Sequence, residues 1–64
     1  MTTATDVNGE VKEWCIKRVY PTGLIEYGDD LSRSIADEWE KEYNRSWGWL
    51  GIIHQVVHIS ERDK

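Results

Sequence analysis

Residues 11 to 20 alternate between two sets of side chains, which is the pattern of a β-strand. One face holds Trp14, Ile16 and Tyr20 and is interrupted by Arg18; the other holds Glu13, Cys15, Lys17 and Val19. Pro21, Thr22 and Gly23 follow, where proline presets φ and glycine can adopt a positive φ. The pattern predicts a three-residue hairpin loop and a short second strand at residues 24 to 27.

A helical period begins after the break at residues 28 to 30. Ile35, Trp39 and Tyr43 recur every four residues as one apolar stripe, which Trp47 continues. Asp30 or Ser32 could accept the free amide hydrogens of a first turn, and Gly48 follows where the period stops. We therefore predict a helix over about residues 33 to 46.

The run IIHQVVHIS, residues 52 to 60, is rich in β-branched residues and predicts a third strand. The order β, β, α, β indicates an α+β domain, with one helix packed on a three-stranded antiparallel sheet. A right-handed crossover would place the third strand beside the first, giving strand order 2-1-3. The expected core comprises Trp14, Ile16, Tyr20, Ile25, Ile35, Trp39, Tyr43, Ile53, Val57 and Ile59.

The length of 64 residues allows one domain, in which about 60% of the surface of the unfolded chain becomes buried. We expect a flexible leader at residues 1–10, the α+β domain at 11–60 and a frayed tail at 61–64. The single cysteine, Cys15, has no partner for an intramolecular disulfide and is expected to be packed. No signal peptide or membrane span is recognisable, so the sequence predicts a cytoplasmic protein with no membrane contact.

Charge and motif content exclude several functions. The net charge of −4 argues against a protein that follows a nucleic-acid backbone. His54 and His58 have the spacing of a zinc-protease motif, but Gln55 stands where that motif has glutamate. On a strand the two histidines would lie about 13 Å apart, too far to share an ion. We therefore expect no enzyme activity, no metal site and no cofactor.

Trp47, Gly48 and Trp49 follow the predicted helix. Trp47 continues the apolar stripe, whereas Trp49 lies between glycines where no period turns it inward. Trp49 could plug the open end of the sheet. The alternative is an exposed anchor for a partner, because tryptophan is enriched at binding hot spots.

The segment WCIKRVYPTG, residues 14 to 23, with Glu26, Tyr27 and Gly28 resembles the opening of small accessory proteins of actinobacterial genomes and their phages. Those proteins pair such a hairpin with a charged helix and a final strand. The element order is also similar to that of the small RNA polymerase inhibitor of T7-like phages, whose acidic, compact body binds a host enzyme. The resemblance implies an accessory protein and no active residues.

Together these features predict a small non-catalytic protein-binding module, a phage-type accessory protein that regulates or inhibits a host protein with a basic surface. The expected partner-binding residues are Trp49, Trp47, Asp37, Glu38 and Glu42. One alternative is a self-associating structural protein, a homodimer paired through the third strand with Ile52, His54, Val56 and His58. Another is a single-stranded nucleic-acid binder, with Trp47 and Trp49 as stacking platforms and Lys17 and Arg18 as its basic patch.

Overall fold

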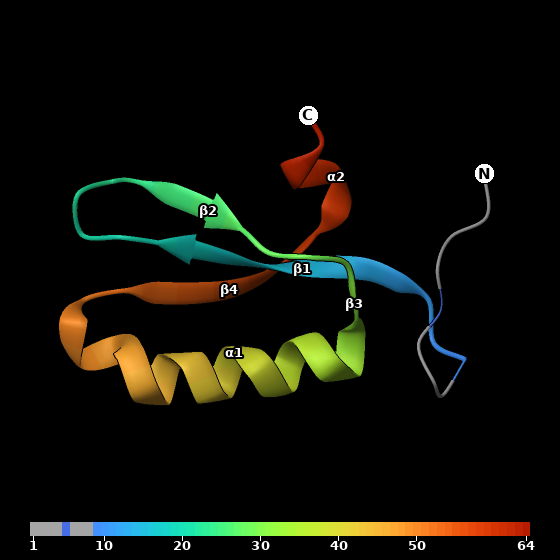
Figure 1. Cartoon of the computed structure of the whole chain (residues 1–64), viewed down its shortest axis with the longest axis horizontal. Helices are drawn as coiled ribbons and strands as arrows, with labels where there is room; N and C mark the ends of the chain where they lie inside the picture. The colour runs from blue at the N-terminus through green and yellow to red at the C-terminus, as the bar shows by residue number, and fades with distance from the viewer. Residues whose placement is uncertain (1–4, 6–8) are drawn as a thin grey trace.

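The predicted hairpin opens the fold in a computed structural model that describes residue 5 and residues 9–64. Most of the leader predicted at residues 1–10 lies outside the described residues. The elements are β1 (Lys12–Val19), β2 (Ile25–Tyr27), β3 (Leu31–Ser32), α1 (Arg33–Trp47), the 3-10 helix η1 (Gly48–Leu50), β4 (Ile53–His58) and α2 (Ile59–Arg62). Figure 1 shows the hairpin and β4 side by side, with α1 beyond β4.

The hairpin turn is built as the sequence predicts. The amide of Gly23 donates to the carbonyl oxygen of Tyr20 at 2.9 Å, and the amide of Tyr20 donates to the carbonyl oxygen of Leu24 at 2.9 Å. Gly23 has φ of 91°, a conformation that side chains other than hydrogen disfavour. Local chemistry therefore closes this turn.

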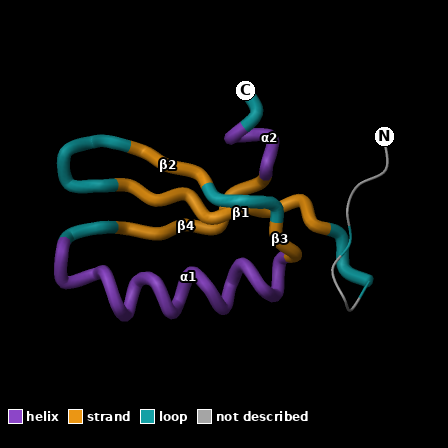
Figure 2. The backbone as a smooth tube through the Cα atoms, viewed as in Figure 1, coloured by secondary structure: helices purple, strands orange, loops and turns teal. Residues whose placement is uncertain are grey.

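The sheet is centred on β1, and all its pairings are antiparallel. β2 and the short β3 pair with β1 along one side, and β4 pairs with it along the other. Figure 2 shows β1 between β2 and β4. The predicted order 2-1-3 is therefore confirmed, because the third predicted strand is β4. The sheet has four strands rather than the predicted three, because the short β3 also pairs with β1. In the register of the sheet, Arg18 lies opposite both Glu26 and His54.

The register decides which side of β4 is buried. Residues opposite each other share a face, so His54 and Val56 face the same way as Arg18 and Ile16. Ile52 and His54 are buried, with 7% and 2% of their surface exposed. The prediction that Ile53 is a core residue is wrong, because Ile53 lies on the opposite face.

Three of the predicted core residues are largely exposed: 54% of Ile53, 46% of Trp39 and 44% of Ile25. The buried apolar residues are Cys15, Ile16, Ala36 and Ile52, so the prediction is confirmed for Ile16, whereas Cys15, Ala36 and Ile52 were not among the predicted core residues. Ile25 and Ile53 both pair with Val19. They therefore lie on the face of the sheet that carries Val19 and Lys17. On helix α1, Ala36 is buried, whereas Trp39 is largely exposed.

Helix α1 ends one residue later than predicted and runs along the outer edge of β4 (Figure 1). Asn44 bonds both backbone groups of His54: its Oδ1 accepts from the amide at 2.9 Å, and its Nδ2 donates to the carbonyl at 3.1 Å. Glu40 accepts from the amide of Val56 at 2.7 Å. These side chains satisfy strand groups that would otherwise be free to pair with another chain.

The carboxyl-terminal segment differs from the frayed tail predicted at residues 61–64, because helix α2 is tied to the hairpin. Lys17 pairs with Glu61 at 3.1 Å, and the hydroxyl of Tyr27 donates to Glu61 at 3.1 Å. Arg62 pairs with Asp30 at 2.7 Å and donates to the carbonyl of Gly28 at 3.1 Å.

Cys15 is buried in the central strand, as expected of a packed thiol, and burial raises its pKa. No helix of the described residues combines the length and apolar character that a membrane crossing requires.

Candidate interaction surfaces

Trp49 is the most exposed large apolar residue in the described part of the chain, with 81% of its surface open. Its indole Nε1 donates to the carbonyl oxygen of Ser46 at 3.0 Å, so the ring is held although it is exposed. Gly51, with φ of 78°, closes the 3-10 turn by donating to the carbonyl of Gly48 at 3.0 Å. The plug alternative for Trp49 is therefore wrong.

Trp47 has a different environment, because it is half-buried beside Arg18 and His54. The guanidinium of Arg18 lies 4.5 Å from the centre of the Trp47 ring and 5.4 Å from that of Tyr43. The rings of Tyr43 and His54 stack with their centres 4.9 Å apart. Trp47 therefore helps to hold a cation, which is a role that the sequence pattern did not indicate.

Figure 1 shows the hairpin turn and the connection from α1 to β4 at the same end of the molecule. These connections and the strand ends next to them carry five exposed apolar residues. A Cβ added to Gly51 would lie 3.2 Å from Pro21, so these two connections are in contact. We name this the turn-end surface and define it as Leu24, Ile25, Trp49, Leu50 and Ile53. Sequence reasoning found only Trp49, because Ile25 and Ile53 were assigned to the core.

The acids expected to meet a basic partner are largely engaged on α1 itself. Asp37 pairs with Arg33 at 3.2 Å, and Glu42 pairs with Arg45. Glu38 is exposed on the same helix. Because such exposed pairs neutralise each other locally, α1 presents mixed charge rather than a continuous acidic face.

The residues predicted for self-association do not form one exposed surface. Ile52 and His54 are buried and Val56 is half-buried, whereas His58 is exposed and lies 3.6 Å from Glu13. A second copy that paired with β4 at His54 and Val56 would have to displace Asn44 and Glu40. The dimer stays a prediction, and the contacts of α1 argue against it.

The basic patch of the nucleic-acid alternative is divided between the two faces of the sheet. Lys17 pairs with Glu61 of α2, whereas Arg18 lies against rings of α1. Adjacent residues on a strand point to opposite faces, which is why the two cations do not act together. This arrangement gives no continuous track for a phosphate backbone.

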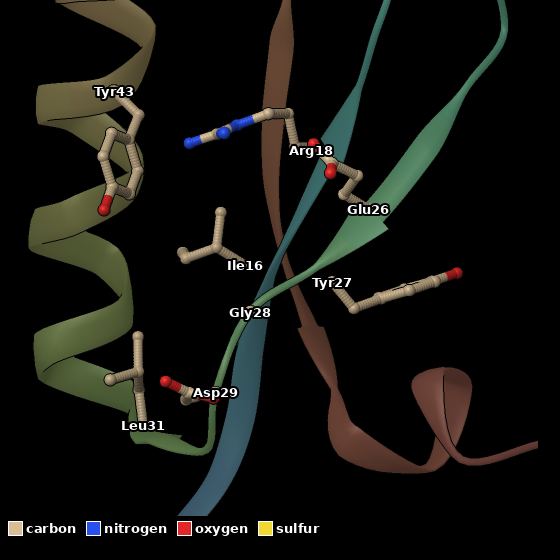
Figure 3. Close-up of a pocket in the computed structure, with 8 residues that line it drawn as sticks. All are labelled: Ile16, Arg18, Glu26, Tyr27, Gly28, Asp29, Leu31 and Tyr43. Carbon is tan, nitrogen blue, oxygen red and sulfur yellow. The ribbon is translucent and has the colours of Figure 1, made fainter.

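An open groove of about 340 Å³ lies between α1 and the hairpin (Figure 3). Helix α1 follows the edge of β4, and the space between the helix and β2 forms the groove. Its lining residues are Ile16, Arg18, Glu26, Tyr27, Gly28, Asp29, Leu31 and Tyr43. The one sequence signal for this groove is Arg18, the cation within an otherwise apolar strand face.

His54 links the groove to the core. Its Nε2 accepts a hydrogen bond from Nε of Arg18 at 2.8 Å, and its Nδ1 is buried with no hydrogen-bond partner among the described residues. Burial lowers the pKa of His54, and the charge of Arg18 lowers it further. The imidazole is therefore neutral at neutral pH, as accepting a bond from an arginine requires.

Within residue 5 and residues 9–64, no group of three or more histidine, cysteine or acidic side chains could hold a metal ion. Comparisons of the chain with protein-family models, curated proteins and solved structures found no match. The turn-end surface and the groove are therefore the candidate functional features of the described residues.

Proposed function

We propose that this protein is a small non-catalytic protein-binding module whose contact region is the turn-end surface. The observation that carries the proposal is Trp49, which is 81% exposed yet held by a hydrogen bond to Ser46. Contiguous exposed apolar residues are typical of interaction sites, and tryptophan often carries most of the binding energy. A held ring also loses little conformational entropy when a partner covers it.

The partner expected at this surface offers an apolar pocket for the Trp49 ring and a basic surrounding. The net charge of −4 would attract such a partner over long distances, and Glu38 adds an exposed carboxylate on α1. A phage-type accessory protein that inhibits or regulates a host protein would act in this way. This part of the proposal rests on the sequence resemblance.

The test is a pair of alanine variants compared for folding and for partner capture. Trp49→Ala should leave the free energy of unfolding within about 0.5 kcal/mol of the wild-type value, because the ring is mostly exposed. It should weaken capture of a partner by about 2 kcal/mol, or roughly thirtyfold, mainly through faster dissociation. Val11→Ala is the matched control, because Val11 is 43% exposed but lies outside the turn-end surface.

The measurement uses immobilised wild-type and variant proteins with lysate from the source cells, followed by surface binding kinetics on each retained protein. A partner that binds Trp49→Ala as tightly as wild type would show that the turn-end surface is not the contact region. If Trp49→Ala does not fold, the Trp49 ring is needed for folding, which would contradict the proposal that it is an exposed contact residue. Equal losses in Trp49→Ala and Val11→Ala would indicate nonspecific apolar adhesion.

A further inference from the structure

Arg18 differs from the other arginines because no carboxylate of the described residues forms an ion pair with it. The others are paired: Arg33 with Asp37, Arg45 with Glu42, and Arg62 with Asp30 and Asp63. The chain has 12 acids and 8 lysines and arginines, so acids are not scarce. The unpaired arginine is also half-buried, where a charge without a counter-ion is costly.

The guanidinium of Arg18 is held in place by neutral groups. Its Nε donates to Nε2 of His54 at 2.8 Å, while the rings of Trp47 and Tyr43 lie 4.5 and 5.4 Å away. Rings at these distances attract a cation without neutralising it. The two terminal nitrogens of Arg18 make no hydrogen bond to the described residues. Arg18 is thus positioned, with part of its hydrogen-bonding capacity unused.

The unused nitrogens face the groove of about 340 Å³. Figure 3 shows Arg18 extending from β1 toward Tyr43, with Ile16 below it and Leu31 and Asp29 at the other end. Ile16, Leu31 and Tyr43 give this space an apolar lining. Its volume lies within the range of about 300–1,000 Å³ that is usual for small-ligand pockets.

We propose that this groove binds a small monocarboxylate with an apolar body. The carboxylate receives hydrogen bonds from the terminal nitrogens of Arg18, whose planar fork matches its two oxygens. The apolar body lies against Ile16, Leu31 and Tyr43. Glu26 and Asp29 also line the groove and repel a second negative charge, so the ligand is a monoanion. This site is separate from the turn-end surface.

Glu26 is the internal group that could compete for Arg18, because the two residues lie directly opposite each other on β2 and β1. In the structure Glu26 instead accepts a hydrogen bond from the hydroxyl of Tyr20. The charge on Glu26 should therefore weaken ligand binding without replacing it. Removing that charge gives the proposal a direct check.

The experiment titrates the full chain with N-acetyl-L-leucine and, in parallel, with N-acetyl-L-leucinamide, which has the same body without the charge. Two-dimensional NMR follows the amides of β1, β2 and α1 and the Nε–H of Arg18. Wild type should bind the acid at least about tenfold more tightly than the amide, since hydrogen bonds between charged groups are stronger than those to a neutral amide. The largest shifts should fall on residues that line the groove.

Three variants separate the site from general charge effects. Arg18→Gln should lose about tenfold or more in affinity for the acid. Arg45→Gln removes the same charge from an exposed, paired arginine and should bind as wild type does. Glu26→Gln should bind equally or more tightly. If Arg18→Gln fails to fold, the affinities of Arg18→Lys for the acid and the amide supply the same comparison. Lysine keeps the positive charge but lacks the planar, two-pronged guanidinium.

Equal binding of the acid and the amide, or equal loss in Arg18→Gln and Arg45→Gln, would overturn the proposal. Binding of the acid by Glu26→Gln but not by wild type would also overturn it, because Glu26 would then neutralise Arg18 in the native protein. Binding of the peptide Gly-Gly-Gly-Leu through its free carboxylate, with no binding of the acid, would overturn the assignment to a small ligand. Trp49→Ala should bind the acid normally, so failure at the turn-end surface is distinguishable from failure here.

Discussion

Replacing Asn44 tests how α1 protects the outer edge of β4. Asn44 makes two hydrogen bonds, of 2.9 and 3.1 Å, to the backbone of His54, and both are part-buried. Each such bond contributes about 0.5–1.5 kcal/mol net. Alanine has a better helix propensity than asparagine, which returns up to about 0.7 kcal/mol. Asn44→Ala should therefore lower the free energy of unfolding by about 1–2 kcal/mol.

The loss is large for a chain of this size. At about 0.05–0.15 kcal/mol per residue, the whole domain is stable by roughly 3–10 kcal/mol. For small domains a change of 1 kcal/mol shifts the melting temperature by about 4–8 °C, so Asn44→Ala should melt about 4–16 °C lower. Urea unfolding followed by tryptophan fluorescence gives the free energy, and circular dichroism gives the melting temperature.

Ser46→Ala is the matched control, because Ser46 is exposed on the same helix and its side chain makes no hydrogen bond to the described residues. It should be neutral or slightly more stable than wild type. Light scattering at rising concentration adds a second measurement, since Asn44→Ala frees the edge of β4 for another chain. If Asn44→Ala has the same melting temperature as Ser46→Ala and stays monomeric, Asn44 does not protect the edge of β4.

Two further predictions concern pH and the turn after α1. Burial, and then Arg18, lowers the pKa of His54 below about 6.5 in the folded chain, so the unfolded chain binds the proton more readily. The contribution of neutral His54 to stability should be fully present above about pH 6.5 and decrease below it. The urea midpoint should therefore fall more steeply toward pH 5 in wild type than in His54→Gln. An equal dependence of the midpoint on pH in the two proteins would contradict this prediction. Gly51→Ala, at φ of 78° and with Pro21 3.2 Å from the new Cβ, should cost about 1–2 kcal/mol. Gly48→Ala, at φ of −60° with nothing within 4 Å, should be neutral or stabilising in the same melts, and equal effects would refute the strain at Gly51.

Sequence patterns located most elements because their boundaries depend on nearby residues. The hairpin loop was predictable from Pro21 and Gly23, since φ preferences act within a few residues. Helix α1 was predictable to within one residue because its period and its glycine stop are local. The strand order followed from the short connections and the handedness of the crossover.

The buried face of β4 was not predictable, because apolar residues occupy both of its faces. Ile52 and Val56 alternate with Ile53 and Val57, so either set could face the helix. Pairing with β1 resolved this ambiguity: it set His54 opposite Arg18, and His54 became buried beneath rings of α1. A shift of one residue in register would have exchanged the two sets.

Tertiary structure also decided the candidate sites. Trp49 was a candidate from sequence, but only the path of the chain through η1 exposed it at the same end as Ile25 and Ile53. The groove depends on the position of α1, which Asn44 and Glu40 hold at the edge of β4. Contacts between residues far apart in the sequence set that position. Local periodicity specifies which residues form a helix, but it does not specify where that helix lies on a sheet.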